Sequence, residues 1–185
     1  MDAAADGFDA MVLGAGLPAA AEAALSAAGS LRGSDAAGAM ACLMKAQALA
    51  PEHPVVLIAF YRHHFYGHRL AAARDVARRA LVVGAAALGL PALWREVPRC
   101  ALAGTRTDAR TRFYLFVLKG YAYLSLRMGD EAEARDVLAV LRALDPEDHV
   151  GAALLEAVRL RARRDDDEAL PAVFGAAAWA LTAPA

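Results

Sequence analysis

The chain has 185 residues, a length typical of one domain, and its 20 Lys and Arg side chains nearly balance 21 Asp and Glu. The formal net charge of −1 provides no general attraction to nucleic acid or to an anionic membrane, so we expect neither as a partner. Hydrophobic residues make up 58% of the sequence, but 49 residues are alanine, which favours helices that pack closely together.

Several features of the sequence predict a cytoplasmic protein. Cys42 and Cys100 lie far apart and belong to no Cys-x-x-Cys motif, which fits a reducing compartment and indicates neither a disulfide framework nor a zinc site. The N-terminal segment carries acidic residues where a signal peptide would carry Lys or Arg. The longest uncharged runs, 80–94 and 169–185, are shorter than a membrane-spanning helix and contain proline.

Two similar segments lie 34 residues apart in the first half of the chain. GSDAAGAMACLMKAQAL begins at Gly33 and is followed by Pro51, and GHRLAAARDVARRALVV begins at Gly67. Both segments have helical spacing, and alanines occupy the same positions after the glycine. Each segment is therefore predicted to be a helix that follows a glycine turn, with a small-residue face against a neighbouring helix. Proline stops the first of these helices.

A third copy begins at Gly129 and closes at Pro146. The stretch before it, 113–128, contains no proline and carries apolar residues three and four apart, which predicts a helix. The repeating unit is therefore a helix, a glycine turn, a second helix and a proline stop.

The segment from Leu118 to Pro146 resembles a tetratricopeptide repeat (TPR). A bulky residue, a small residue, a turn glycine, an alanine and a closing proline fall at the positions of that pattern, held here by Leu118, Ala122, Gly129, Ala134 and Pro146. Tyr121 and Leu141 depart from the pattern, and the two earlier copies each carry one extra turn residue. The resemblance covers roughly 17–83 and 111–146. It implies a short right-handed superhelix of antiparallel helix pairs, whose first helices line a concave surface.

The regular repeat is interrupted between the second and third copies. Residues 89–110 contain prolines, glycines and Trp94 and are predicted to form an irregular insertion. A capping helix is expected over 148–164, because a short repeat array must cover its ends. We therefore predict one all-α domain over 1–185, with a flexible N-terminus at 1–15 and a short terminal helix or frayed tail at 165–185.

Three histidines are the candidate metal ligands of this chain. His64 and His68 are four residues apart, the spacing that places two ligands on one helix face. Gly67 lies between them at a predicted helix end, however, which places His68 in a turn, and no carboxylate or cysteine completes a site. The sequence predicts no cofactor and no catalytic residue. A metal-binding or enzymatic protein that uses His63, His64 and His68 stays the alternative.

Aromatic residues concentrate within the first helices of the second and third copies, where they either fill the core among alanines or reach a groove. In the third copy the resemblance implies groove positions at Phe116, Lys119, Tyr123 and Arg127. In the second copy we select Arg62, His63 and Tyr66 as groove residues. These seven residues are the predicted partner-binding set.

The predicted function is non-catalytic binding of another protein, by an adaptor or assembly factor that captures a peptide or helix. A dedicated client chaperone and a homo-oligomer that buries the aromatic surface against a second copy are alternatives. The pairing of AFYRHHFYGHRL with RFYLFVLKGYAYLSLRMGD also resembles small TPR-like proteins encoded beside nitrogen-fixation genes in proteobacteria. That resemblance implies a role in the maturation or protection of nitrogenase.

Overall fold

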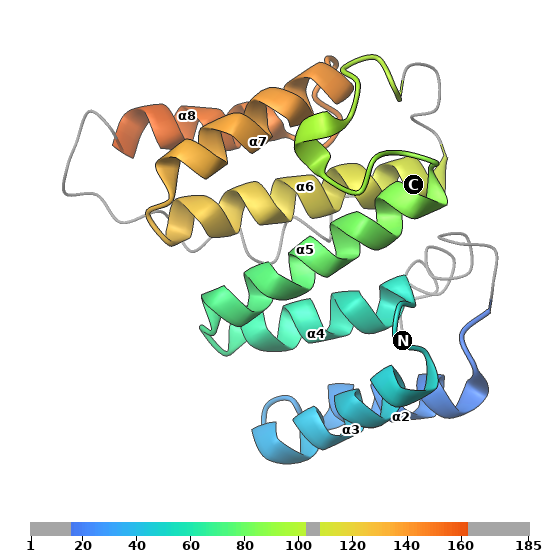
Figure 1. Cartoon of the computed structure of the whole chain (residues 1–185). Helices are drawn as coiled ribbons and strands as arrows, with labels where there is room; N and C mark the ends of the chain where they lie inside the picture. The colour runs from blue at the N-terminus through green and yellow to red at the C-terminus, as the bar shows by residue number, and fades with distance from the viewer. Residues whose placement is uncertain (1–15, 103–107, 163–185) are drawn as a thin grey trace.

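The protein is described here from a computed structural model over residues 16–102 and 108–162, and within these ranges it is all-α, with seven α-helices and no strand (Figure 1). The predicted N-terminus at 1–15 and terminal segment at 165–185 lie outside the described residues. The elements are α2 (Ala19–Leu31), α3 (Ala36–Leu49), α4 (Pro54–Tyr66), α5 (Leu70–Ala87), the short 3-10 helix η1 (Trp94–Glu96), α6 (Ala109–Arg127), α7 (Glu131–Leu144) and α8 (Ala152–Ala162).

Three helix hairpins form the body of the structure, and each has a predicted glycine in its turn. Helices α2 and α3, α4 and α5, and α6 and α7 pack as pairs. The three connections lie on the same side of the molecule, at the left in Figure 1. We call this the turn side.

The second and third turns differ in which residue takes the left-handed backbone conformation. Gly129 has a φ of +75°, a backbone conformation that costs glycine little. In the second turn, His68 rather than Gly67 takes the left-handed conformation, with a φ of 56°. This difference accompanies the extra residue that the sequence carries there.

Helix starts and stops follow ordinary capping chemistry. The Asp35 carboxylate accepts a hydrogen bond from the Gly38 backbone N–H at 2.8 Å, which caps α3. Helix α4 begins with Pro54, whose missing N–H costs nothing at that position. Helices α3 and α7 end two residues before Pro51 and Pro146, in keeping with the predicted proline stops.

Helix α6 is the centre of the core. It packs against α5 on one side and α7 on the other, and 14 of its 19 residues are buried. Gly84 of α5 permits this close approach, because a Cβ at that position would lie 3.2 Å from Tyr114 and 3.3 Å from Phe113. Small residues of one helix therefore face large aromatic residues of the next.

Two residues of the segment between α5 and α6 contact the third hairpin. The segment contains η1, whose Trp94 is buried with its ring 6.4 Å from that of Tyr121. Arg95 pairs with Glu133 of α7, and Glu133 also accepts a hydrogen bond from the Tyr121 hydroxyl at 2.5 Å. Trp94 and Arg95 thus attach this part of the irregular segment to the α6–α7 pair.

Helix α8 packs on α7 and also contacts α6. Its Arg159 is buried and forms ion pairs with Glu131 at 3.0 Å and Glu156 at 2.8 Å, so this charge is compensated. In the described ranges, no helix combines the length and apolar character needed to cross a membrane.

Candidate interaction surface

The structure places the seven predicted partner-binding residues at different depths. Phe116, His63 and Tyr123 are only 6%, 9% and 5% exposed, so their side chains lie in the core or at its edge and do not form an open groove. Arg62, Lys119 and Arg127 are half-buried, and Tyr66 is 40% exposed. Most of the other clustered aromatics of α4 and α6 are also core residues.

A row of three aromatic side chains with an arginine at each end crosses all three hairpins. The Arg32 guanidinium lies 5.8 Å from the ring centre of Tyr66, and the Arg127 guanidinium lies 5.9 Å from that of Tyr123. Phe65 joins the two halves, because its ring is 5.5 Å from Tyr66 and 5.8 Å from Tyr123. We call these five residues the aromatic–arginine row.

The row lies on the turn side because its members come from the last turns of first helices. Arg32 follows the end of α2, Phe65 and Tyr66 close α4, and Arg127 closes α6. In Figure 1 these helix ends are stacked one above another at the left. The repeat of the hairpin is therefore what brings residues nearly a hundred positions apart into one surface.

Two histidines, His63 and His64, lie beside Arg69 near the α4 end of the row, and both have lowered pKa values. Burial lowers the pKa of His63, and the nearby Arg69 and Arg32 lower it further. Burial likewise lowers the pKa of His64, with Arg69 and His63 contributing. Both imidazoles are therefore mostly neutral at pH 7.

Two buried polar atoms at this end have no hydrogen-bond partner among the described residues. They are Nε of Arg62 and Nε2 of His63. A buried polar atom without a hydrogen bond costs free energy, so each of these two atoms calls for a partner such as a water molecule, an ion or a bound protein. Both atoms belong to α4, one turn before the exposed Tyr66.

Lys119 occupies a different environment, two turns before Arg127 on α6. Its Nζ lies close to Gly151, at 3.3 Å from where a Cβ of that residue would be, and so near the start of α8. Burial lowers the pKa of Lys119, and Asp148 partly opposes this effect. Lys119 therefore lies beside the start of α8 and apart from the row.

The three histidines do not come together as a metal site. The His63 and His64 rings meet edge-on with their centres 5.6 Å apart, and Nδ1 of His64 accepts a hydrogen bond from Arg69. His68 lies in the turn. Across the described ranges, no group of three His, Cys, Asp or Glu side chains is arranged to hold a metal ion.

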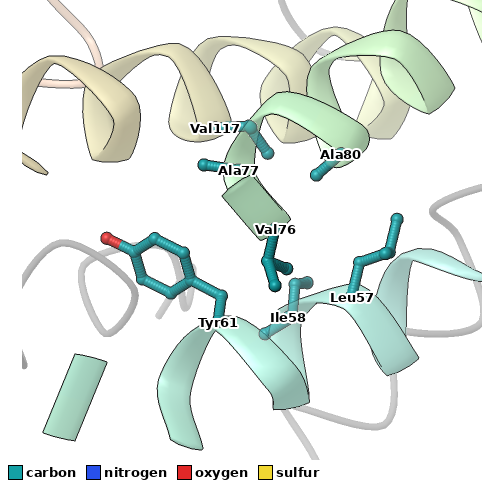
Figure 2. A pocket seen from close by; sticks show the side chains of 7 residues that line it. All are labelled: Leu57, Ile58, Tyr61, Val76, Ala77, Ala80 and Val117. Atoms are coloured by element: carbon teal, nitrogen blue, oxygen red, sulfur yellow. The ribbon is translucent and has the colours of Figure 1, made fainter. Parts of the chain in front are cut away.

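A small cavity lies between α4, α5 and α6. Figure 2 shows its lining, in which Tyr61 and Ile58 of α4 face Val76 and Ala77 of α5, with Val117 of α6 above them. Its volume of about 10 Å³ has room for roughly one water molecule. The lining is apolar, so this cavity is a packing gap and not a substrate site.

Phe65 and Arg32 are the two members of the row that lie outside the predicted partner-binding set. The position of Arg32 carries a signal in the sequence. Arg32 immediately precedes Gly33, Tyr66 immediately precedes Gly67, and Arg127 lies two residues before Gly129. Alignment of the three turn glycines would have found an arginine or aromatic residue within the two positions before each of them.

Fold and surface together define an all-α protein of stacked helix hairpins with an aromatic and basic turn side. No protein family model matches the sequence, and no solved structure matches it. The chain is similar to an uncharacterized 19.8 kDa protein in the nifW 5′ region of Azotobacter chroococcum mcd 1, with 43% identity over 115 residues. The match spans 61% of this chain and 64% of that relative, less than two thirds of its length.

Proposed function

We propose that the protein is a TPR-like, non-catalytic interaction module that binds another protein in the course of nitrogen fixation. The observation that carries this proposal is the aromatic–arginine row, to which all three hairpins contribute. Its Arg32, Phe65, Tyr66 and Arg127 reach the surface, and Tyr123 lies buried beneath them. Tyr and Arg are the residue types that dominate binding energy at protein interfaces.

The arrangement of the hairpins supports the TPR-like part of the proposal. In a helical repeat array each unit buries its faces only against its neighbours. Here α5 packs against both α4 and α6, and α7 packs against both α6 and α8. First helices of successive pairs also touch, because Phe65 of α4 contacts Tyr123 of α6 and α6 contacts α8.

The distribution of polar groups supports binding over catalysis. Arg62 and Arg127 lie on different hairpins, and the described cavity is apolar and has room for about one water molecule. Catalysis needs groups that converge on one reacting atom, whereas a partner segment is recognised by groups spread along its length.

The relative in the nifW 5′ region supports the biological setting. That relative is encoded in the 5′ region of nifW, and 43% identity over 115 residues supports a related role for this chain. The role we propose is that of an adaptor or assembly factor for the nitrogenase system. A chaperone dedicated to one client of that system is the second form of the same activity.

The test is affinity capture from cells that grow on dinitrogen, with cells grown on ammonium as the reference. Capture of a nitrogen-fixation protein only in the first condition is expected. Retention of no protein above background, or of the same proteins in both conditions, contradicts the proposal. Circular dichroism of the captured bait confirms that it is helical.

A further inference from the structure

Four arginines of the turn side have no carboxylate partner within the described ranges, whereas several other arginines of the protein do. Arg74, Arg78, Arg95, Arg135 and Arg159 all form ion pairs with Asp or Glu. None of four turn-side arginines forms an ion pair within the described ranges, namely Arg32, Arg62, Arg69 and Arg127.

Two of these unpaired guanidinium groups are half-buried. Arg62 and Arg127 have lost part of their hydration, and a charge that is partly buried without a counter-charge is costly. Arg127 donates to the Tyr123 hydroxyl at 3.0 Å, a neutral acceptor that does not compensate the charge. Nε of Arg62 has no acceptor among the described residues.

His63 gives an independent indication of a missing ligand. Its side chain is more than nine-tenths buried, and its Nε2 has no partner in the described part of the chain. In the tautomer with a proton on Nε2, this atom donates a hydrogen bond, and an incoming oxygen atom would satisfy it.

We propose that the turn side binds an acidic segment of a partner protein, whose Asp and Glu carboxylates pair with Arg62, His63 and Arg127 while its apolar side chains pack on Tyr66. This inference rests on the proposed function and names the chemistry of the partner. Arginine suits the role because its planar group binds a carboxylate through two parallel hydrogen bonds.

Charge complementarity favours a short acidic segment over a nucleic acid. The whole chain has a net charge of −1, so its field does not attract a long polyanion. Four arginines without ion pairs in the described ranges lie together on the turn side, which matches a local run of carboxylates. The exposed Tyr66 also offers apolar area that a protein segment can cover.

The test measures fluorescence anisotropy of the full chain with a labelled peptide of four Asp-Glu-Leu repeats. The reference peptide has four Asn-Gln-Leu repeats, which keep the shape and remove the charge. We expect the acidic peptide to bind at least about tenfold more tightly, a difference of about 1.4 kcal/mol. The preference should shrink between about 50 and about 300 mM NaCl, because salt screens exposed charges.

A matched pair of variants locates the binding. The double substitution Arg62→Gln/Arg127→Gln should weaken acidic-peptide binding about tenfold or more, since each lost charge pair is worth on the order of 1 kcal/mol. The control, Arg99→Gln/Arg135→Gln, makes the same charge change on the insertion and on α7 and should leave binding nearly unchanged. Far-ultraviolet circular dichroism establishes that both variants keep their helices.

A measurement on the unaltered protein covers the case in which a variant does not fold. In histidine-labelled protein, the acidic peptide should shift the His63 side-chain nitrogen resonances and the neutral peptide should not. Equal binding of the two peptides, no binding of either, equal loss in both double variants, or an unmoved His63 overturns the inference. Tighter binding of a thymidine oligonucleotide than of the acidic peptide overturns it in favour of nucleic acid. If affinity capture still succeeds with the Arg62→Gln/Arg127→Gln protein, the proposed function stands and this inference alone fails.

Discussion

Replacement of Tyr114 by Phe should make this protein more stable, because the Tyr114 hydroxyl is buried without a partner. The side chain is 0% exposed, and its oxygen has no hydrogen bond within the described residues. A buried hydroxyl that forms no hydrogen bond costs about 1–3 kcal/mol. Phe keeps the ring that packs against Gly84, so we expect the free energy of unfolding to rise by about 1 kcal/mol and Tm by roughly 2–4 °C.

Tyr121, two turns further along α6, provides the matched control. Its hydroxyl accepts a hydrogen bond from Arg78 at 3.3 Å and donates one to Glu133 at 2.5 Å. Tyr121→Phe removes the same atom together with two hydrogen bonds, so that among the described residues Arg78 and Glu133 keep only their ion pairs with Asp75 and Arg95. It should therefore lower the free energy of unfolding by about 1–3 kcal/mol. Urea titrations followed by circular dichroism measure both changes.

The buried Tyr114 hydroxyl also predicts how the free energy of unfolding changes in alkaline solution. Burial raises the pKa of Tyr114 to about 12. The unfolded chain loses this proton near its ordinary pKa of 10, so stability is full below pH 10 and falls as pH rises toward 12. Two pKa units correspond to at most about 3 kcal/mol. Tyr114→Phe should lose less stability than the wild type over this range. If Tyr114→Phe instead destabilises the protein at pH 7 as much as Tyr121→Phe, the hydroxyl has a partner and the reasoning is refuted.

Three further predictions test the packing, the insertion and the turn side. Gly84→Ala should lower the free energy of unfolding by about 1–3 kcal/mol, because the buried aromatic rings opposite it have no room to move. Gly29→Ala, where no atom lies near the added Cβ, should raise the free energy of unfolding by about 0.5–1 kcal/mol. Equal effects of the two substitutions in urea titrations would contradict this. Glu133→Ala removes the partner of Arg95 and should speed tryptic cleavage within the insertion, and an unchanged rate would show that other contacts hold it. Since burial, and after it Arg69 and Arg32, lower the pKa of His63, the unfolded chain takes up a proton first as pH falls through about 6.5. Stability should therefore fall from pH 7 to pH 5, and His63→Asn should reduce the loss; an equal loss in both proteins would exclude His63 as a cause.

The hairpins were predictable from sequence because local residues determine where a helix begins and ends. Glycine after a helix and proline after its partner act over a few residues, and these signals fall at Gly33, Gly67, Gly129, Pro51 and Pro146. The all-α class followed from the same pattern. The pattern did not show which residue of each turn takes the left-handed conformation, because in the second turn His68 takes it and not Gly67.

The burial of individual side chains was harder to predict, because it depends on which elements pack against each residue. Phe116 and Tyr123 have the spacing of groove positions, yet α5, α7 and α8 surround α6 and both residues are buried. The signal was present in the composition of α6, which is apolar on nearly every side, as is typical of a buried helix. The spacing of residues along one face of α6 does not show that the opposite faces are apolar as well.

The row itself depends on contacts between hairpins, which sequence spacing does not show. Tyr66 and Arg127 were selected from their helices, but their link through Phe65 and Tyr123 arises only when α4 and α6 pack together. Arg32 joins them because the first turn lies beside the second.

The most direct measurement is site-specific photo-crosslinking in cells that fix dinitrogen. A photoreactive phenylalanine analogue replaces Tyr66 in the row, or Val82, which is 48% exposed on α5 and serves as the control. The account predicts that position 66 crosslinks to a distinct protein and that position 82 does not. Crosslinking of the same protein at both positions, or of none at position 66, would contradict a partner-binding surface on the turn side.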